Sequence, residues 1–332
     1  MSDHLLEIKD LKVSFFTPAG EVKAVNGVTY DLDEGRVLGI VGESGSGKSV
    51  SVSAMMQLLA YPGRVVGGSI HFNGQDVLAM NAEQIQAIRG KDIGMIFQDP
   101  MTSLNPVFTV GEQLVETLRR HTKMTRAEAW QRGIEMLRLV GINNPEQRIK
   151  QYPHEFSGGM RQRAMIAMTL LCNPKLLIAD EPTTALDVTI QAQIMDLMKR
   201  LREQINAAII LITHDLGIVS DICDEVIVMY AGRIVERGTT DDIFYRPAHP
   251  YTRGLLRCLP RLDSDGSEPL EPIEGTPVDL LALPKGCAFA PRCNKCMKVC
   301  LTQQPPTFTM GKGHTSTCWL HALENMEGVQ EK

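Results

Sequence analysis

The chain has 332 residues, of which 43% are hydrophobic and 22% are charged, an ordinary composition for a soluble globular protein of about two domains. The formal net charge of −5 argues against a non-specific nucleic-acid binder, which should be basic, so we expect no nucleic-acid partner. The first residues contain acids and no long apolar run. No stretch approaches the roughly 18 apolar residues that a membrane-spanning helix needs. We therefore expect a chain that meets a membrane only through partner proteins.

The first part of the chain predicts three short strands followed by a glycine-rich turn. Apolar residues alternate or run together at 6–13, 22–28 and 37–41, as they do in strands. After the turn, Ser49 to Leu59 carries apolar residues on a helical period. This order of strand, glycine turn and helix opens a βα nucleotide-binding unit.

The rest of the chain up to about Thr239 alternates between helical and strand patterns. The expected strands are 92–97, 176–179, 207–213 and 225–230, and the expected helices are 110–118, 126–140, 157–171 and 190–202. Such alternation predicts an α/β fold with a parallel sheet covered on both faces. Residues 106–153 form a helical insertion between strands. Frequent prolines after Thr239 predict a separate loop-rich appendix.

The strongest chemical signal is the run from Gly42 to Ser49, GESGSGKS, which fits the phosphate-binding pattern G-x-x-x-x-G-K-[ST]. Its glycines let backbone N–H groups turn toward phosphate oxygens, and the following helix adds its positive N-terminal dipole. Lys48 is expected to reach the β- and γ-phosphates and Ser49 to bind Mg²⁺. The motif follows a predicted strand and opens a helix, which is the context that supports ATP binding.

A second signal is the pair of carboxylates that ends the apolar run 176–179. Asp180 stands where an acid would hold Mg²⁺, and Glu181 is placed to activate the attacking water. Taken alone, the pair could equally be a solvated strand end.

Three further features are weaker. Ser157, Gly158 and Gly159 open a helix and form a second candidate anion site, although Ser157 is also a good helix cap. Gln98 ends a strand and could supply a metal or water ligand. His214 follows the strand at 207–213 and could contact a γ-phosphate.

The order of these motifs resembles that of the ABC ATPases. The glycine loop, Gln98, Ser157–Gly159, Asp180–Glu181, Ala185–Asp187 and His214 correspond to the Walker A, Q-loop, signature, Walker B, D-loop and H-loop of that family. The resemblance implies an ABC-type P-loop ATPase with a RecA-like parallel-sheet core, a helical subdomain and a small Cys-rich C-terminal extension. It assigns residues 1–98 and 166–245 to the core, 99–165 to the helical signature subdomain, and 246–332 to the extension.

The resemblance also assigns roles. Two such domains meet head to tail, so the signature would serve the partner's nucleotide, and Gln98 would link the γ-phosphate to the helical block that grips a permease. Phe15 is the candidate for stacking on adenine, with Phe16 as its alternative. The catalytic residues are then Glu181, His214 and Gln98, and the Mg²⁺ ligands are Ser49, Gln98 and Asp180. The remaining ATP contacts are Phe15, Gly42, Glu43, Ser44, Gly45, Ser46, Gly47, Lys48, Val50, Ser157, Gly158, Gly159 and Asp187.

A narrower resemblance involves the stretches 97–106 (FQDPMTSLNP), 180–193 (DEPTTALDVTIQAQ), 229–233 (MYAGR) and 249–256 (HPYTRGLL). These are similar to the ATPases of bacterial oligopeptide and dipeptide importers. The implied partners are a second ATPase in a heterodimer, two transmembrane permeases and an extracytoplasmic peptide-binding protein. The implied location is the cytoplasmic face of the inner membrane. A nickel or related importer, and a non-transport ABC ATPase, remain the alternatives.

Five of the eight cysteines crowd into the last fifth of the chain, where clustered cysteines without a secretory signal favour metal ligands over disulfides. Four thiolates suit zinc or an iron–sulfur cluster, and only Cys293 and Cys296 form a close pair of the kind typical of zinc. The family resemblance instead implies a [4Fe–4S] cluster on Cys287, Cys293, Cys300 and Cys318, with Cys296 as a spare. Free structural thiols are the remaining alternative.

Overall fold

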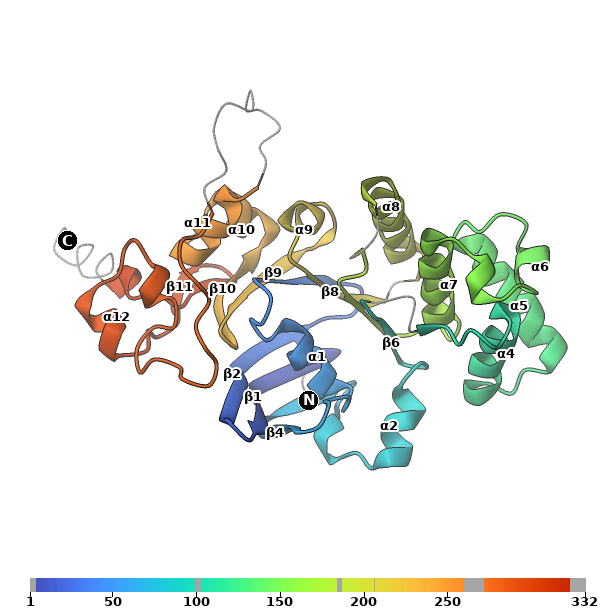
Figure 1. Cartoon of the computed structure of the whole chain (residues 1–332), viewed down its shortest axis with the longest axis horizontal. Helices are drawn as coiled ribbons and strands as arrows, with labels where there is room; N and C mark the ends of the chain where they lie inside the picture. The colour runs from blue at the N-terminus through green and yellow to red at the C-terminus, as the bar shows by residue number, and fades with distance from the viewer. Residues whose placement is uncertain (1–3, 99–102, 184–186, 206, 260–271, 323–332) are drawn as a thin grey trace, which may run out of the picture. The chain divides into compact units, whose positions relative to one another are not determined.

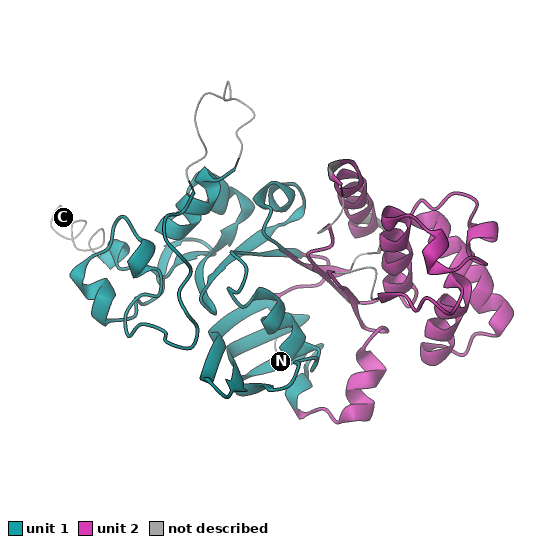
Figure 2. Ribbon diagram, viewed as in Figure 1, with its two compact units in different colours: residues 1–31, 37–78, 213–332 teal, residues 32–36, 79–212 magenta. Residues whose placement is uncertain are grey.

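The computed structural model describes residues 4–98, 103–183, 187–205, 207–259 and 272–322. For residues 188 and 203–205 it describes the backbone alone. The chain divides into two compact units, coloured separately in Figure 2. Unit 1 comprises residues 1–31, 37–78 and 213–332, and unit 2 comprises residues 32–36 and 79–212. Each unit is described by itself.

The N-terminal strands of unit 1 form an antiparallel sheet (Figure 1). Its order is β2-β1-β4-β5, with β1 (Leu6–Thr17), β2 (Gly20–Leu32), β4 (Gly63–Phe72) and β5 (Gln75–Asp76). The sequence patterns predicted strands here but did not specify how they pair. Only Pro18 and Ala19 join β1 to β2, and a connection this short allows only antiparallel neighbours, because parallel ones need a crossover of a dozen residues or more.

The remaining strands of unit 1 run in the order β11-β12-β10-β9-β3. They are β3 (Val37–Val41), β9 (Glu225–Tyr230), β10 (Arg233–Thr239), β11 (Phe308–Gly311) and β12 (His314–Ser316). Strands β3 and β9 pair in parallel, as predicted, whereas β10, β11 and β12 add an antiparallel edge. Every residue of β3 is buried, which explains its unbroken apolar sequence.

The helices of unit 1 are short. They are α1 (Lys48–Met55), α9 (Leu216–Ile222), α10 (Thr240–Tyr245), α11 (Pro250–Arg257) and α12 (Lys298–Thr302), with 3₁₀ turns at Val77–Ala79 and Ala290–Arg292. Helix α1 ends four residues before the predicted Leu59. Gln57 adopts a φ of 48°, and this left-handed backbone stops the helix although the apolar period continues.

Unit 2 carries three parallel strands in the order β8-β7-β6. They are β6 (Ile93–Ile96), β7 (Leu176–Asp180) and β8 (Ala208–Thr213). All three lie within one residue of their predicted bounds. Their parallel pairing confirms that part of the predicted α/β fold.

The helices of unit 2 are α2 (Ala82–Ile88), α4 (Val110–His121), α5 (Arg126–Leu139), α6 (Pro145–Arg148), α7 (Gly158–Leu170) and α8 (Val188–Ile205), with a 3₁₀ turn at Pro153–Glu155. Helices α4, α5 and α7 pack together as the helical block. Thr109 and Thr125 cap α4 and α5 through reciprocal bonds with Glu112 and Glu128, so both helices begin where their sequences predict. Among the described residues of both units, no helix combines the length and apolarity needed to cross a bilayer.

Candidate nucleotide site

The glycine loop between β3 and α1 has a backbone that only glycine adopts easily at two positions. Gly42 has a φ of 150° and Gly47 a φ of 98°. A Cβ on Gly42 would overlap the carbonyl oxygen of Met229, and one on Gly47 would overlap that of Ala24. The loop is therefore wrapped tightly against its own unit, in a curved shape that directs backbone N–H groups inward.

Lys48 and Ser46 give this loop its capacity to bind an anion. Lys48 is buried, and its Nζ donates to the carbonyl oxygens of Gly42 at 2.7 Å and Glu43 at 3.0 Å. The Ser46 hydroxyl is buried without a hydrogen-bond partner in the described part of the chain. Gly47 caps α1 without any side chain to occupy the helix N-terminus. An orphaned hydroxyl, a buried ammonium and an uncovered helix N-terminus together fit the phosphates of a nucleotide.

Glu43, the second residue of the loop, is held by two residues distant in sequence. Its backbone N–H donates to the Tyr251 hydroxyl at 2.8 Å. Its carboxylate receives two bonds from Arg292, at 2.6 and 3.0 Å. Burial raises the pKa of Tyr251, and the Glu43 carboxylate raises that of Arg292, so the first stays a neutral phenol and the second a cation. Sequence reasoning missed both residues, because nothing local marks a tyrosine or arginine more than 200 positions away.

In unit 2 the structure brings two predicted catalytic residues together. Asp180 ends β7, and Glu181 follows with a φ of 47°, an uncommon conformation for a non-glycine residue and one often found at functional sites. The Glu181 N–H donates to the Ile212 carbonyl at 2.9 Å, which fixes the backbone. Gln98 Nε2 donates to Glu181 Oε2 at 3.1 Å. A carboxylate at a fixed strand end, with an amide beside it, is suited to orienting a water molecule.

The signature segment begins α7 in the same unit. Ser157 caps the helix by accepting the Met160 N–H at 3.3 Å. Of its two predicted roles, the helix cap is therefore the one formed in this structure. Ser157 and Gly158 are both exposed, and a Cβ on Gly158 would meet no atom within 4 Å. Inside the helix, Gln162 Nε2 donates to the Pro182 carbonyl at 2.6 Å. The helix is thus tied directly to the residues that follow Glu181.

The other predicted nucleotide contacts are placed less decisively. Phe15 on β1 is half-buried, with its ring over Gly63, whereas Phe16 is 43% exposed beneath the Arg64 guanidinium. His214 is exposed between β8 and α9. Asp187 is exposed and caps the start of α8 by accepting the Ile190 N–H at 3.0 Å. Ala185 and Leu186 lie outside the described residues. The adenine contact stays a prediction.

The cysteine segment does not gather into an ion site. Across the described residues, no group of three or more His, Cys, Asp or Glu side chains lies close enough to hold a metal ion, so a single-ion site at Cys287, Cys293, Cys300 and Cys318 has no support. Two parts of this segment do meet, one at Gly286 and Cys287 and the other at Cys300 and Leu301. Gly286 packs so closely on the backbone of Cys300 and Leu301 that it leaves no room for a Cβ, and the Cys287 N–H donates to the Cys300 carbonyl at 2.7 Å. All eight cysteines are described and none is disulfide-bonded.

Burial raises the pKa of three of the four predicted cysteine ligands. Burial, reinforced by the neighbouring thiols, raises the pKa of Cys287 and of Cys318 to about 11. Burial also raises the pKa of Cys293. These groups therefore stay protonated thiols at neutral pH unless a cation stabilises their thiolate form.

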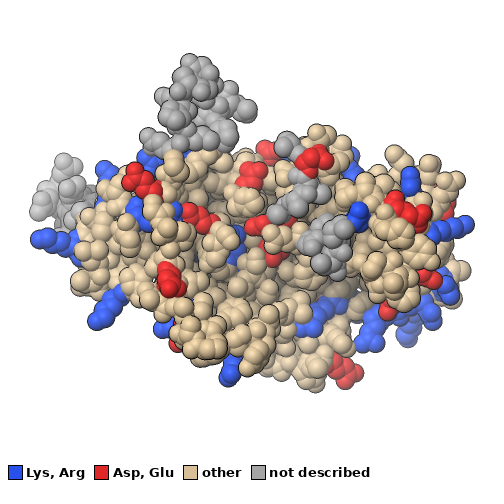
Figure 3. Space-filling model, viewed as in Figure 1, with Lys and Arg blue, Asp and Glu red and all other residues tan. Residues whose placement is uncertain are grey.

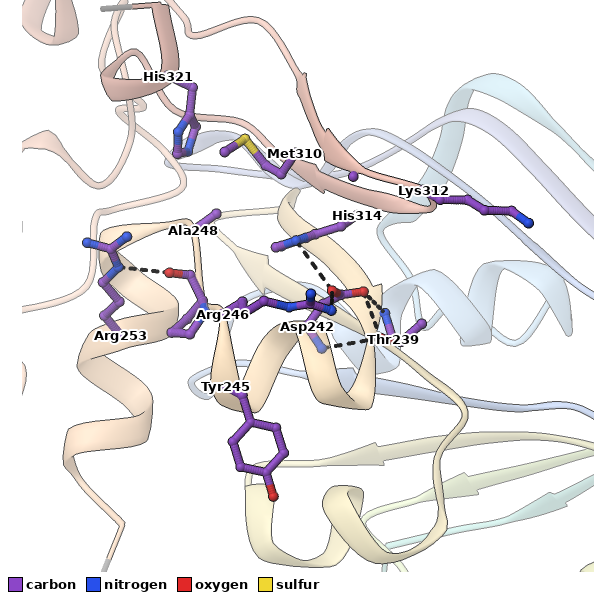
Figure 4. Close-up of a pocket in the computed structure, with 12 residues that line it drawn as sticks. Thr239, Asp242, Tyr245, Arg246, Ala248, Arg253, Met310, Lys312, His314 and His321 are labelled. Atoms are coloured by element: carbon purple, nitrogen blue, oxygen red, sulfur yellow. Dashed lines mark hydrogen bonds and ion pairs between the residues drawn. The ribbon is translucent and has the colours of Figure 1, made fainter. Parts of the chain in front are cut away.

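A separate cavity of about 810 Å³ lies in unit 1 and is drawn in Figure 4. Asp242 stands at its centre, accepting bonds from Thr239 and Arg246, and His314 approaches it from β12. No residue of the glycine loop lines this cavity. The charged groups drawn there are largely paired with one another, so the cavity adds nothing to the nucleotide chemistry.

Charges of both signs are spread over the molecular face shown in Figure 3, with Lys and Arg gathering at the lower right of the view. On this face no broad basic surface of the kind that tracks a nucleic-acid backbone is visible.

Comparisons with known proteins define the class first. A family model described as ABC transporter matches residues 25–184. The solved dimer of the ATP-binding cassette MJ0796, in a post-hydrolysis state with ADP and Pi, is 25% identical with a TM-score of 0.64, covering 71% of this chain and 98% of that one. The structure of cbiO1 from Clostridium perfringens, part of the ABC transporter complex cbiONQ, gives a TM-score of 0.62 at 27% identity, covering 74% of this chain and 92% of that one. The fold and site are those of an ABC ATPase, an enzyme that hydrolyses ATP.

The particular branch follows from closer relatives. A model of the oligopeptide/dipeptide transporter C-terminal region matches residues 235–300. The oligopeptide transport ATP-binding protein OppD of Bacillus subtilis is 57% identical, covering 95% of this chain and 88% of that protein. The dipeptide transport ATP-binding protein DppD of Bacillus subtilis is 53% identical, covering 96% and 95%. The chain belongs to the family of oligopeptide and dipeptide transport ATP-binding proteins, which confirms the family predicted from its motifs.

Proposed function

We propose that this chain hydrolyses ATP to drive the uptake of oligopeptides or dipeptides across the cytoplasmic membrane. The observation that carries the proposal is the continuous similarity to ATP-binding proteins named for peptide transport, from the N-terminal strands through the C-terminal region. Import of nickel or a related solute is the nearer alternative, and a non-transport ABC ATPase is the more distant one.

Uptake in cells tests this proposal directly. Cells lacking the chain are supplied with either the wild-type chain or Glu181→Gln, and uptake of a labelled dipeptide, a labelled pentapeptide and nickel is measured. Peptide uptake restored only by the wild type supports the proposal. If the wild-type chain restores nickel uptake and leaves peptide uptake unchanged, the transported substrate is nickel and not a peptide. If no uptake changes, a non-transport role is favoured.

Within this function each predicted site residue has a chemical task. Lys48 and the loop amides of residues 42–50 would hold the phosphates, and Ser49, Asp180 and Gln98 would hold Mg²⁺, which would neutralise charge on the phosphates. Glu181 accepts the proton of the attacking water, and Gln98, already hydrogen-bonded to it, keeps its carboxylate directed. His214 contacts the γ-phosphate, and Phe15 stacks on the adenine.

The signature argues for a second ATPase subunit. Ser157 and Gly158 are exposed on unit 2, whereas the glycine loop of residues 42–49 belongs to unit 1. We assign Ser157–Gly159 and Asp187 to the nucleotide of a partner ATPase in a heterodimer. The isolated chain should then hydrolyse ATP slowly and gain activity on adding the partner. Full turnover by a chain shown to be monomeric would contradict this assignment.

The remaining partners are two permeases and an extracytoplasmic peptide-binding protein, with the chain on the cytoplasmic face of the inner membrane. Apolar side chains on unit 2 support a docking surface for a permease: Phe97 is 44% exposed, Val107 70% and Phe108 48%. They come directly before and soon after Gln98 in sequence, so a permease bound there would sense the catalytic glutamine. Purification from membranes under mild detergent, followed by identification of co-purifying multi-span subunits, tests the assembly.

The predicted domain division into a core (1–98 and 166–245), a helical subdomain (99–165) and an extension (246–332) remains part of the proposal. For the extension, we propose a [4Fe–4S] cluster on Cys287, Cys293, Cys300 and Cys318. Support comes from the close contact of Gly286 with the Cys300 backbone and from the hydrogen bond of the Cys287 N–H to the Cys300 carbonyl. A single tetrahedral ion would need sulfurs about 3.8 Å apart, whereas a cluster separates them more widely.

Anaerobic purification with iron, sulfide and zinc analysis and visible absorption decides the metal. Equal iron and sulfide with a broad visible band supports the cluster. Zinc without sulfide replaces the cofactor, and a folded protein with no metal leaves free thiols.

A further inference from the structure

The C-terminal region supplies one buried cation to the glycine loop. Arg292 ends the 3₁₀ turn Ala290–Arg292, and its side chain is only 4% exposed. Its two terminal nitrogens bind the two carboxylate oxygens of Glu43, 249 positions earlier in the sequence. This is the bidentate geometry in which a planar guanidinium fixes a carboxylate most firmly.

Arg292 is itself held in place by the chain around it. Nε donates to the Glu274 carbonyl at 2.9 Å, and Nη2 donates to the Ile273 carbonyl at 3.2 Å. The guanidinium carbon lies 5.9 Å from the centre of the Tyr230 ring. Because its N–H groups are bonded on several sides, the Arg292 side chain is fixed in one orientation. A shift of the C-terminal segment that carries Arg292 would therefore also move Glu43.

Nearly every polar group of Glu43 is occupied as a result. Its N–H is bonded to Tyr251, its carboxylate to Arg292, and its carbonyl accepts from Lys48 and from the Ser46 N–H at 3.2 Å. Glu43 is thus the point where the phosphate-binding lysine and the C-terminal region meet. Phe289, three residues before Arg292, packs on Tyr230 and Tyr251 with ring centres 5.3 Å apart in both cases, which joins the same segments by apolar contact.

We propose that Arg292 is a positioning residue for ATP: by clamping Glu43 it holds the glycine loop in its phosphate-binding shape. The C-terminal extension then takes part in nucleotide binding from the far end of the sequence. A loop displaced by about 1 Å presents its amides and Lys48 at the wrong distance, and such displacements cost catalytic sites up to about 100-fold.

The test compares Arg292→Met with Arg237→Met in the full chain. Arg237 is a control in the same unit: it is also largely buried and also forms carboxylate ion pairs, but its partners are Asp31 and Glu225 and not a residue of the glycine loop. ATP dissociation constants, the KM and kcat of the assembled transporter, and unfolding midpoints are measured for each variant. We expect Arg292→Met to weaken ATP binding about 10- to 100-fold with KM rising more than kcat falls. Arg237→Met should lower the unfolding midpoint while leaving ATP affinity within about twofold.

A second pair of variants tests the proposal even if Arg292→Met folds poorly. Glu43→Gln removes the charge from the other side of the pair, at a side chain that is 28% exposed, and Arg292→Lys keeps the cation without the bidentate fork. We expect Glu43→Gln to weaken ATP binding. We expect Arg292→Lys to bind ATP more tightly than Arg292→Met but less tightly than the wild type. The double variant Glu43→Gln with Arg292→Met should bind no worse than the weaker single variant, because the two act through one contact. Unchanged ATP affinity in Glu43→Gln, or equal losses of affinity in the Arg292 and Arg237 variants, would overturn the proposal.

Discussion

The glycine loop of unit 1 and the signature segment of unit 2 are similar in sequence and different in surroundings. Both place glycines and serines at the N-terminus of a helix, α1 in one case and α7 in the other. Ser44 and Gly45 of the loop are exposed, but Gly42 and Gly47 are buried and meet backbone atoms of other segments, and Arg292 and Tyr251 fix Glu43. In the signature, Gly159 is buried against Ile190, but Ser157 and Gly158 are exposed, Gly158 has open space around it, and Ser157 makes only a local capping bond.

This difference supports the proposal that the chain itself shapes the glycine loop, whereas a partner's nucleotide completes the signature contact. Packing pre-organises the glycine loop, so ATP meets a shape that is already formed. Ser157 and Gly158 lack such support, because Ser157 makes only a local capping bond and Gly158 meets no atom within 4 Å. One chain therefore carries a complete binding loop and an incomplete contact, which agrees with ATP hydrolysis in pairs of chains.

The largest expected effect tests whether ATP hydrolysis can be lost while ATP binding at the glycine loop is kept. Glu181→Gln keeps the shape and removes the base, so hydrolysis by the assembled transporter should fall about 10²- to 10⁴-fold. ATP binding should stay within a few-fold, because the glycine loop is untouched. Turnover and nucleotide binding are measured separately, with Asp196→Asn, an exposed carboxylate on α8, as the control. Near-normal turnover would remove Glu181 from the catalytic role.

A matched pair of glycine variants tests the comparison itself. Gly42→Ala would force a Cβ into the Met229 carbonyl at a φ of 150°, so we expect a loss of roughly 3 kcal/mol of unfolding free energy together with ATP binding. Gly158→Ala meets open space on a helix, and the free energy should change by less than about 1 kcal/mol. Denaturant unfolding of both chains measures the difference. Similar losses in the two variants would show that the signature is packed as tightly as the loop.

Acid should weaken the supports of the glycine loop and spare the signature. Burial, with His321 and Arg253 nearby, lowers the pKa of His249 to about 3, and its Nδ1 accepts the Tyr251 N–H at 3.1 Å. The unfolded chain takes up this proton below a pH of about 6.5 while the folded chain resists it. Stability is therefore fully present above that pH and falls as the pH drops toward 3, by about 2 kcal/mol at pH 5.

The control for this effect is His249→Asn, which can still cap α11 but does not titrate. The difference in unfolding free energy between wild type and this variant, followed from pH 7.5 to 4.5, isolates the histidine from the carboxylates. A difference that stays constant with pH would mean that His249 contributes no pH dependence.

The smallest expected effect separates the two roles of Ser157. Ser157→Ala removes the cap and should cost about 1 kcal/mol of stability, whereas Ser157→Asn keeps the cap. If Ser157 also serves a partner's nucleotide, both variants should lower hydrolysis in the assembled transporter while the ATP affinity of the isolated chain stays constant. Hydrolysis lost only in Ser157→Ala would leave capping as the sole role.

Local sequence determined the elements and the chemistry that depend on near neighbours. The strand at Val37–Val41, the helices capped at Thr109 and Thr125 and the run from Gly42 to Ser49 all follow from residues within a few positions of one another. The order of these motifs was enough to predict the family, because a nucleotide site of this kind is built from short segments with fixed local geometry.

The tertiary structure decided what depends on contacts between distant segments. It placed β1 and β2 in an antiparallel sheet, stopped α1 at Met55, and left the predicted cysteine ligands without a single-ion geometry. It also joined Gln98 to Glu181 and Arg292 to Glu43. A hydrogen bond between residues 83 or 249 positions apart leaves no periodicity or spacing in the sequence, because only the folded backbone brings its two partners within reach.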